Sequence, residues 1–587
     1  MRRLLNISLS SVPALIGAGI CFLPMLWSKS IGTSSHCFYS TLSITIPVIL
    51  IYSIWIPIYL LKRKTVFKID AIDVLLCSYI LFAALNTILH NKDINDAVIT
   101  KWATFLSIYL TIRCLSNSKR ILNVILYGLV CSALIQCIIF LVQKFLHSDV
   151  FFNPFSATAQ FSNPGHLAAF LAVIFPLPLV LADQQTSKTI KWGFRISAAL
   201  LFASILLSTS RGAILAGFIS FLLYLCTKKT KSSRIKKNLF IIIATAVVLS
   251  SFLIYYIRPK SADSRLLIWK VTAREYIESP LLGKGTLSLS RDYMHLQADY
   301  FKCHPDSKFW TIADNNHQSF NETLHILYEQ GLVGFVLILT AIMIWLKRQM
   351  HLYLRLAMVS LIVVSCFLYT SDIGPIFCLL PTLLGTRYSE YKESKSVENE
   401  KTRRKRTEPV LMTTLSLGLL LLSFFYVKNM KQAASYLRAF TKGEISYSCI
   451  NDKYKSILEK DINFALILSK QIVQHGTPEE TTTVINRISD HTISTSDMIC
   501  DLGDAYSLAG HYNNAQQAYT DSYYMVPGKI TPLIKLFNLQ RENNDLSGAK
   551  LTAERILNNR YKVTGSLVVR SKNQAKQFIN ILNYSNL

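Results

Sequence analysis

The chain contains 587 residues, of which 51% are hydrophobic, and it carries a formal net charge of +27 at pH 7. Its mean hydropathy of +0.32 is too high for a soluble globular protein of this length. Because a helix of about 18 or more apolar residues spans the hydrocarbon core of a bilayer, we predict an all-α polytopic membrane protein with about thirteen spanning helices. The predicted spans are 9–27, 38–61, 71–89, 98–114, 121–145, 167–182, 194–209, 212–227, 239–257, 322–346, 353–370, 372–386 and 410–427.

The distribution of charge argues against nucleic-acid binding. Basic side chains gather in alternate loops between the predicted spans, and such loops stay on the cytoplasmic side. These clusters are 62–64, 113–120, 188–191, 228–237, 347–348 and 387–406. This pattern accounts for most of the net charge, so we expect no nucleic-acid partner. It also places the long loop 258–321 and the C-terminal region outside, and the first span is interpreted as a signal-anchor helix.

The predicted spans divide the chain into four parts. Residues 1–257 carry nine spans, and residues 258–321 form a large external loop. Residues 322–427 carry the remaining spans and include the basic cytoplasmic loop 387–408. Residues 428–587 have the composition of a soluble domain.

This C-terminal part matches the tetratricopeptide pattern of about 34 residues. The matching positions are Leu502, Gly503, Tyr506, Gly510, Ala515, Tyr519 and Pro527. Helical repeats of this kind present surfaces that bind other proteins. We therefore expect a module that contacts a protein partner or positions an acceptor.

The long external loop begins with an amphipathic helix. Apolar side chains recur at helical spacing between Ser264 and Ile277, which predicts a helix at the outer membrane surface with Trp269 at the headgroup level. Arg274 and Glu278 have the i, i+4 spacing of an ion pair. The turn 283–285 then stops the helix, and its Gly-Lys-Gly sequence is weak evidence for phosphate binding.

Two earlier helix ends carry polar residues on the predicted external side. Asn163 precedes a Pro-Gly turn, so it either caps the next helix or lies beside a substrate at the membrane surface. Arg211 follows Ser210 in a short external turn, against the positive-inside rule. It either snorkels to lipid headgroups or binds an anion, because a guanidinium matches phosphate oxygens and a helix N-terminus adds donors.

The end of the long loop carries further ionisable residues. Glu322 begins a predicted span, where it could cap the helix or act chemically, since carboxylates within a membrane are costly. The cysteines lack the spacing of a metal site. Cys303, Cys449 and Cys500 lie in external regions, and two of them could form a disulfide.

Several of these motifs together resemble the O-antigen ligase and polymerase superfamily. They are Ser210-Arg211-Gly212, the helix from Ser264 to Trp269 that leads to Pro280–Gly285, the stretch Asn321–Gly334 and, more loosely, Phe161 with Asn163-Pro164. The motifs occur in the family's order on the predicted external side and cover roughly residues 1–430.

The resemblance implies a glycosyltransferase of the GT-C class in the bacterial inner membrane. Members take a glycan from undecaprenyl diphosphate at the periplasmic face and use neither a metal ion nor another cofactor. The acceptor is lipid A-core in ligases, a growing glycan in polymerases, and a Ser or Thr hydroxyl in protein O-oligosaccharyltransferases. We rank a ligase first; a polysaccharide transporter is the alternative outside the enzyme class.

The resemblance also implies roles for individual residues. By motif position, Arg211 and Arg265 bind the diphosphate, and Ser210, Asn163, Arg274 and Asn321 support them. Many relatives read His-Pro-His-Asn where this chain has Gln318 to Asn321, so Phe320 replaces a histidine. We expect the catalytic base to be His317 or Glu322, with His317 favoured, in an inverting displacement.

Overall fold

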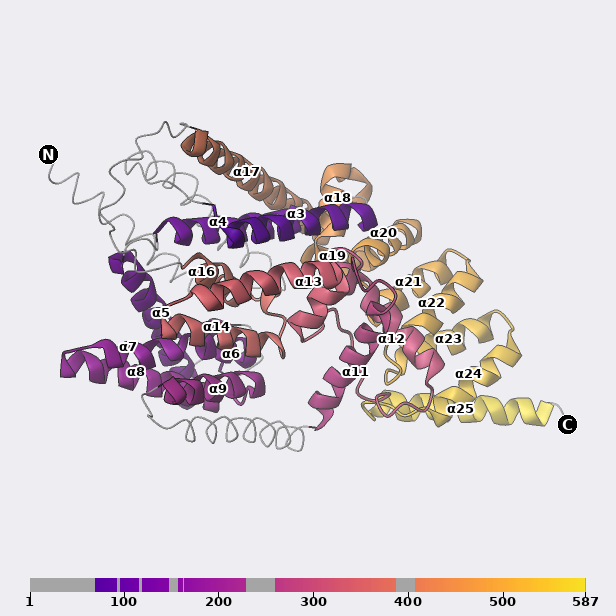
Figure 1. Ribbon diagram of the computed structural model, residues 1–587. Coiled ribbons are helices and arrows are strands. Elements are labelled where there is room, and N and C mark those ends of the chain that lie inside the picture. The colour runs from indigo at the N-terminus through magenta and orange to yellow at the C-terminus, as the bar shows by residue number, and fades with distance from the viewer. Residues whose placement is uncertain are drawn as a thin grey trace.

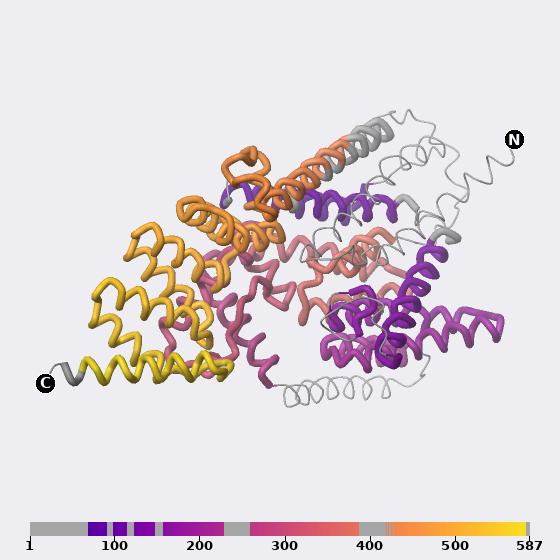
Figure 2. Tube along the Cα trace, turned by 180° about the vertical axis from the view of Figure 1, so that it is seen from behind, coloured from indigo at the N-terminus to yellow at the C-terminus, as the bar shows by residue number. Residues whose placement is uncertain are grey.

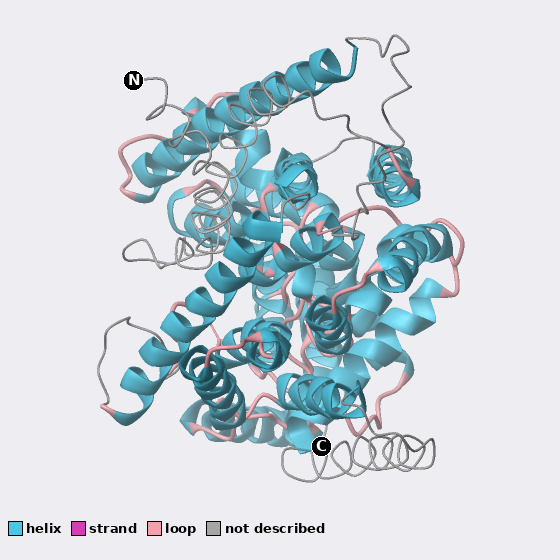
Figure 3. Cartoon of the chain, turned by 60° about the vertical axis from the view of Figure 1, so that its left-hand side comes forward, coloured by secondary structure: helices cyan, strands magenta, loops and turns pink. Residues whose placement is uncertain are grey.

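The computed structural model of the chain describes residues 69–91, 96–115, 119–146, 157–161, 163–227, 259–386 and 407–585. Within these ranges Figure 3 shows helices and loops and no strand. The predicted all-α fold class is therefore confirmed. The predicted spans 9–27, 38–61 and 239–257 lie outside the described residues, as does the basic loop 387–406.

Five stretches of the described chain are helical, long and apolar enough to cross a membrane. They are α3 (Ala71–Asn91), α5 (Lys119–Phe145), the pair α6 (Pro164–Ile174) and α7 (Pro176–Gln184), α8 (Lys188–Leu207) and α13 (Glu322–Arg348). The bundle also contains α4 (Asp96–Leu115), α9 (Arg211–Thr227) and α14 (Leu352–Ser365). These helices agree with a multi-pass membrane protein.

The predicted span 372–386 is not a continuous helix. Residues 372–386 form the end of the short turn η1 (Thr370–Asp372), followed by α15 (Gly374–Phe377) and α16 (Leu379–Gly385). Seven helical residues rise only about 10 Å, too little to cross a bilayer. Pro375 and Pro381 each lie near a helix start, the position where a missing N–H is tolerated, so this apolar stretch is divided into two short helices.

An ionic network joins three helices at the predicted cytoplasmic end of the bundle. Asp70 lies 3.8 Å from the guanidinium of Arg113 and 3.6 Å from that of Arg348. Asp73 lies 3.7 Å from Arg113 and accepts a hydrogen bond from Tyr109. The network therefore ties α3, α4 and the end of α13 together.

The long external loop contains two helices, α11 (Pro259–Tyr276) and α12 (Ser288–Cys303). In Figures 1 and 2 they lie between the membrane helices and the C-terminal helices. The side chain of Trp269, which we expected at the headgroup level, is partly buried against the core of this region, and its indole N–H donates to the carbonyl of Ser319 at 2.9 Å. This bond fixes the end of the loop against α11.

The C-terminal region is a series of helices that follow the long α17 (Thr407–Thr441). They are α18 (Asp452–Lys460), α19 (Ile462–His475), α20 (Pro478–His491), α21 (Ser496–Leu508), α22 (Tyr512–Met525), α23 (Thr531–Glu542), α24 (Leu546–Asn558) and α25 (Ser566–Ser585). Successive helices from α18 to α25 pack against each other. A Cβ at Gly503 would lie 2.5 Å from the ring of Tyr519, so this glycine allows α21 and α22 to pack closely. The tetratricopeptide assignment itself stays a prediction.

The C-terminal helices share one hydrophobic core with α11 and α12. Polar contacts also cross this interface. Gln297 donates to the carbonyl of Met525 at 2.5 Å, His295 lies 2.9 Å from the hydroxyl of Ser494, and Trp310 donates to Asn559 at 2.7 Å. The loop is therefore held by the C-terminal helices. Cys303, Cys449 and Cys500 are all free thiols here, so no disulfide joins any two of them.

A turn of the long loop also docks on a break in α13. The helix is interrupted at Gly331, which has a φ of +62°. The N–H groups of Lys284 and Gly285 donate to the carbonyls of Tyr328 and Glu329 at 3.0 and 2.8 Å. A Cβ at Gly283 would lie 2.6 Å from the backbone nitrogen of Gly331. Two of the stretches that carry the family resemblance, Pro280–Gly285 and Asn321–Gly334, are thus in direct backbone contact, and we call this contact the joint.

We expect Gly283→Ala to destabilise the protein more than Gly443→Ala. Both glycines have a positive φ, which costs an alanine about 1–2 kcal/mol, but only the methyl group at Gly283 would meet backbone atoms. Thermal unfolding in detergent would measure the difference, with Gly193→Ala in open space on α8 as the control. Equal shifts for the Gly283 and Gly443 variants would contradict the proposed joint.

Candidate functional site

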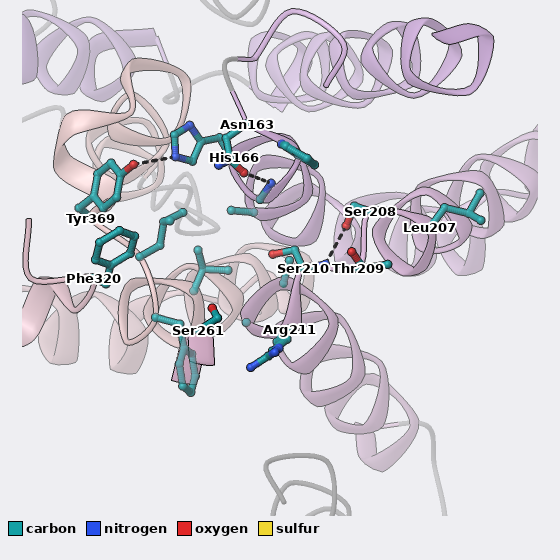
Figure 4. A pocket seen from close by; sticks show the side chains of 18 of the residues that line it. Asn163, His166, Leu207, Ser208, Thr209, Ser210, Arg211, Ser261, Phe320 and Tyr369 are labelled. Carbon is teal, nitrogen blue, oxygen red and sulfur yellow. Dashed lines mark hydrogen bonds between the residues drawn. The ribbon is translucent and has the colours of Figure 1, made fainter. Parts of the chain in front are cut away.

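A cavity of about 460 Å³ lies where several helix ends meet. Its walls come from the end of α5, the starts of α6, α9 and α11, the turn 207–210, Phe320, and the end of α14 with the residues after it. All these are ends that the charge pattern predicts to be external. Figure 4 shows the cavity with Arg211 and Ser210 on one side and His166 and Tyr369 on another.

The described residues that line the cavity include three cations and no carboxylate. The cations are Lys144, Arg211 and Arg265. Burial lowers the pKa of Arg265, and repulsion from Arg211 lowers it further. Arg265 forms no ion pair with a described carboxylate, and its guanidinium instead lies 5.5 Å from the ring centre of Phe320. The cavity is therefore suited to an anion.

The starts of α6, α9 and α11 add to this positive potential. The N-terminus of a helix carries partial positive charge and unpaired N–H groups. Asn163 caps α6, because its side chain accepts a hydrogen bond from the N–H of Gly165 at 2.7 Å. At the start of α9, a Cβ at Gly212 would lie 2.9 Å from Phe367, so glycine lets the segment after α14 approach closely.

Two residues of the cavity wall have left-handed backbone conformations. Thr209 has a φ of +56° and Phe320 a φ of +51°. Such conformations cost free energy in residues with a Cβ, and they are common at functional sites. They turn the chain immediately before Arg211 and before α13.

The cavity brings together four of the residues that the sequence analysis singled out: Arg211, Arg265, Ser210 and Asn163. Asn321 does not line it; its side chain caps α13 by accepting from the N–H of Leu324 at 3.2 Å.

Arg274 also lies away from the cavity lining and is exposed on α11. The expected pair with Glu278 is wrong, since Glu278 lies 3.8 Å from Lys284 instead. Lys284 also pairs with Glu275, so the Gly-Lys-Gly turn uses its lysine to anchor the loop.

The two predicted bases are not in the cavity wall either. Glu322 accepts hydrogen bonds from the N–H of Ser371 at 3.1 Å and the hydroxyl of Thr370 at 3.2 Å. Burial lowers the pKa of His317, although the carboxylate of Asp372 opposes that shift. A catalytic role for either residue stays a prediction.

A polar cluster lies beside these two residues. Asp372 accepts hydrogen bonds from Lys101 at 2.6 Å and from Gln318 at 2.7 Å, and His325 lies 3.2 Å from Glu329. The cluster joins α4, η1 and the first turns of α13. Among the described residues, no group of three or more His, Cys, Asp or Glu could hold a metal ion.

The sequence analysis missed three residues of the cavity wall as site residues. They are Lys144, His166 and Tyr369. Lys144 lies at a predicted external helix end, so the positive-inside argument used for Arg211 also applied to it. His166 directly follows the Pro-Gly turn after Asn163, which was the available signal for it, and no local signal marked Tyr369.

Comparison with known proteins gives one match. Residues 196–339 match the family model described as O-Antigen ligase. This segment runs from α8 past the middle of α13 and contains both Arg211 and Arg265. No curated protein matches the chain. The match supports a ligase or polymerase type of activity, a lipid-linked glycan donor and a membrane setting.

We expect Thr209→Gly to raise the stability of the protein by about 1 kcal/mol, because glycine adopts a positive φ without steric cost. Thermal unfolding in detergent would measure the change. Thr483→Gly, at an exposed position inside α20, should instead lower stability through helix propensity. A decrease for both variants would show that the Thr209 side chain stabilises the turn by more than its strain costs.

Proposed function

We propose that the protein transfers a glycan from undecaprenyl diphosphate to an acceptor hydroxyl, a proposal supported by the match of residues 196–339 to the O-antigen ligase family model. The reaction takes place at the periplasmic face of the bacterial inner membrane, with lipid A-core as the acceptor. The observation that carries this proposal is the cavity that Arg211 and Arg265 both line, with no carboxylate among the described lining residues.

The cavity matches the chemistry of a diphosphate leaving group. The diphosphate gains negative charge as the bond to the anomeric carbon breaks, and fixed donors stabilise that charge without having to reorganise. Each guanidinium presents a planar fork of donors that fits phosphate oxygens. Ser210 and the starts of α6 and α9 supply further donors at the same place. We propose that these groups bind the diphosphate without a metal ion.

The position of the cations also bears on the alternative of a polysaccharide transporter. Transporters hold substrates near the bilayer midplane, in broken helices. Here Lys144, Arg211 and Arg265 all line a cavity at the predicted external ends of the helices. This arrangement supports an enzyme that acts on a lipid headgroup at the membrane surface.

The acceptor decides between three activities that would use the same donor site. A growing glycan would make the protein a polymerase, and a Ser or Thr hydroxyl would make it a protein O-oligosaccharyltransferase. The C-terminal helices favour neither, because the face of α20 and α22 that meets α12 is filled by the chain itself. We propose lipid A-core on the basis of the family match.

We expect Arg211→Ala and Arg265→Ala each to lower the rate of transfer about 100-fold or more, because each removes a fixed donor to the leaving group. The assay would use the purified protein with donor lipid extracted from host membranes. Lys308→Ala is the matched control, since Lys308 is an exposed cation of the same external loop. Full transfer by both arginine variants would rule out the proposed donor site.

Deletion in the native host should abolish glycan-capped lipopolysaccharide while leaving the uncapped form and the glycoproteins unchanged. Gel separation of both fractions would show this, with restoration by the wild-type gene as the control. Capping limited to single repeats would indicate a polymerase. Loss of protein glycosylation with intact lipopolysaccharide would indicate a protein O-oligosaccharyltransferase.

A further inference from the structure

The cavity contains a proton acceptor that the donor site does not use. Among the described lining residues, His166 is the side chain with an imidazole nitrogen that can accept a proton. The guanidinium groups of Arg211 and Arg265 have no acceptor atom, and an ammonium such as Lys144 is already protonated. The lining hydroxyl groups need a base before they can become nucleophiles.

His166 is in direct contact with a tyrosine of the same wall. Its Nε2 lies 3.1 Å from the hydroxyl of Tyr369, and the two rings meet edge to face with centroids 5.5 Å apart. The imidazole is 9% exposed, whereas Tyr369 is only half-buried. Tyr369 is therefore the more accessible member of the pair, with the imidazole behind its hydroxyl (Figure 4).

Both side chains are held in place by neighbouring groups. The backbone N–H of His166 donates to the carbonyl of Asn163 at 3.1 Å in the capped first turn of α6. The ring of Tyr369 packs edge to face against Phe320 at 5.1 Å, and Phe320 in turn lies under the guanidinium of Arg265. The pair is therefore fixed relative to the proposed diphosphate site.

The placement of the pair suits an acceptor rather than the diphosphate. In Figure 4, Tyr369 and His166 lie on one side of the cavity, and Arg211 with Ser210 lies on another. A diphosphate bound at Arg211 would leave the tyrosine side free for the attacking hydroxyl. Glu322 and His317, by contrast, do not line this cavity, and Glu322 already holds the segment 370–371.

We propose that Tyr369 and His166 form the proton relay that activates the acceptor hydroxyl, an inference that rests on the proposed function. The acceptor hydroxyl gives its proton to the oxygen of Tyr369 while Tyr369 passes its own proton to Nε2 of His166. The acceptor oxygen bonds to the anomeric carbon, and the bond from that carbon to the diphosphate oxygen breaks with its electron pair. His166 then returns the proton through Tyr369 to the released diphosphate.

In this scheme Tyr369 is the catalytic residue, because it contacts the acceptor. His166 acts through Tyr369 by orienting its hydroxyl and taking up its proton. Tyr369→Phe removes the hydroxyl but keeps the ring contacts with Phe320 and His166, so the variant should fold. We expect its kcat to fall about 100-fold or more, the usual contribution of general base catalysis, with the KM for donor lipid within about 2-fold of wild type. Binding of undecaprenyl diphosphate should likewise be unchanged.

A double variant separates a relay from two independent structural effects. His166→Asn should lower kcat as much as Tyr369→Phe, and the combined variant should be no slower than either one, because one relay can be lost only once. The matched control is Tyr353→Phe, since Tyr353 stacks on His351 at 5.1 Å at the predicted cytoplasmic end of α14. It should transfer at the wild-type rate.

Three results would overturn the relay. They are a Tyr369→Phe variant with wild-type kcat, effects that multiply in the double variant, and loss of transfer in His317→Asn or Glu322→Gln with Tyr369→Phe still active. In each case the arginine variants would still be inactive if the proposed function is right. Retained transfer by Arg211→Ala and Arg265→Ala would instead refute the proposed function, and the relay with it.

Discussion

Repulsion between two guanidinium groups is the constraint on which the arrangement of this protein depends. Arg211 begins α9 and Arg265 lies in the second turn of α11, yet both reach one cavity whose described lining has no carboxylate. The lowered pKa of Arg265 reflects its burial and this repulsion. Packing elsewhere must hold the two charges together before any ligand arrives. A bound diphosphate then gains the full interaction with donors that are already in position, which is the source of catalysis by preorganised charge.

The packing that opposes this repulsion comes from three separate contacts of the external loop. Trp269 joins α11 to the end of the loop through the carbonyl of Ser319. The turn at Gly283 pairs with the break in α13 at Gly331, where neither position has room for a Cβ. The third contact is the core that α11 and α12 share with the C-terminal helices. Each contact fixes the loop at a different point, so α11 cannot move relative to α13 and the C-terminal helices without breaking at least one of them.

The sequence alone predicted the parts of this design that leave a local signal. Hydropathy gave the fold class and most helices, and the positive-inside rule made Arg211 conspicuous because it lies on the wrong side. Hydropathy did not predict that the span 372–386 is divided into two short helices, because hydropathy does not register proline positions. The sequence did not predict the contact between His166 and Tyr369 either, since 203 residues separate them. The packing of Trp269 against the protein was not predicted, because an amphipathic pattern shows which face of a helix is buried but not whether protein or lipid covers that face.

The C-terminal helices pack against the external loop that forms part of the cavity wall, and this packing does not depend on the identity of the acceptor. α12 lies between the C-terminal helices and the cavity. Its Gln297 donates to the carbonyl of Met525, and its His295 contacts the hydroxyl of Ser494. The segment that follows α12 in the chain ends at Phe320. The ring of Phe320 contacts both the guanidinium of Arg265 and the ring of Tyr369. A shift of α12 would be passed along this segment to both the arginines and Tyr369 of the cavity wall. Since the interaction of fixed charges falls with their distance from the ligand, small displacements at the C-terminal interface would weaken binding at the arginines. A partner that binds the outer faces of these helices would thus reach the site through α12 rather than through a contact of its own.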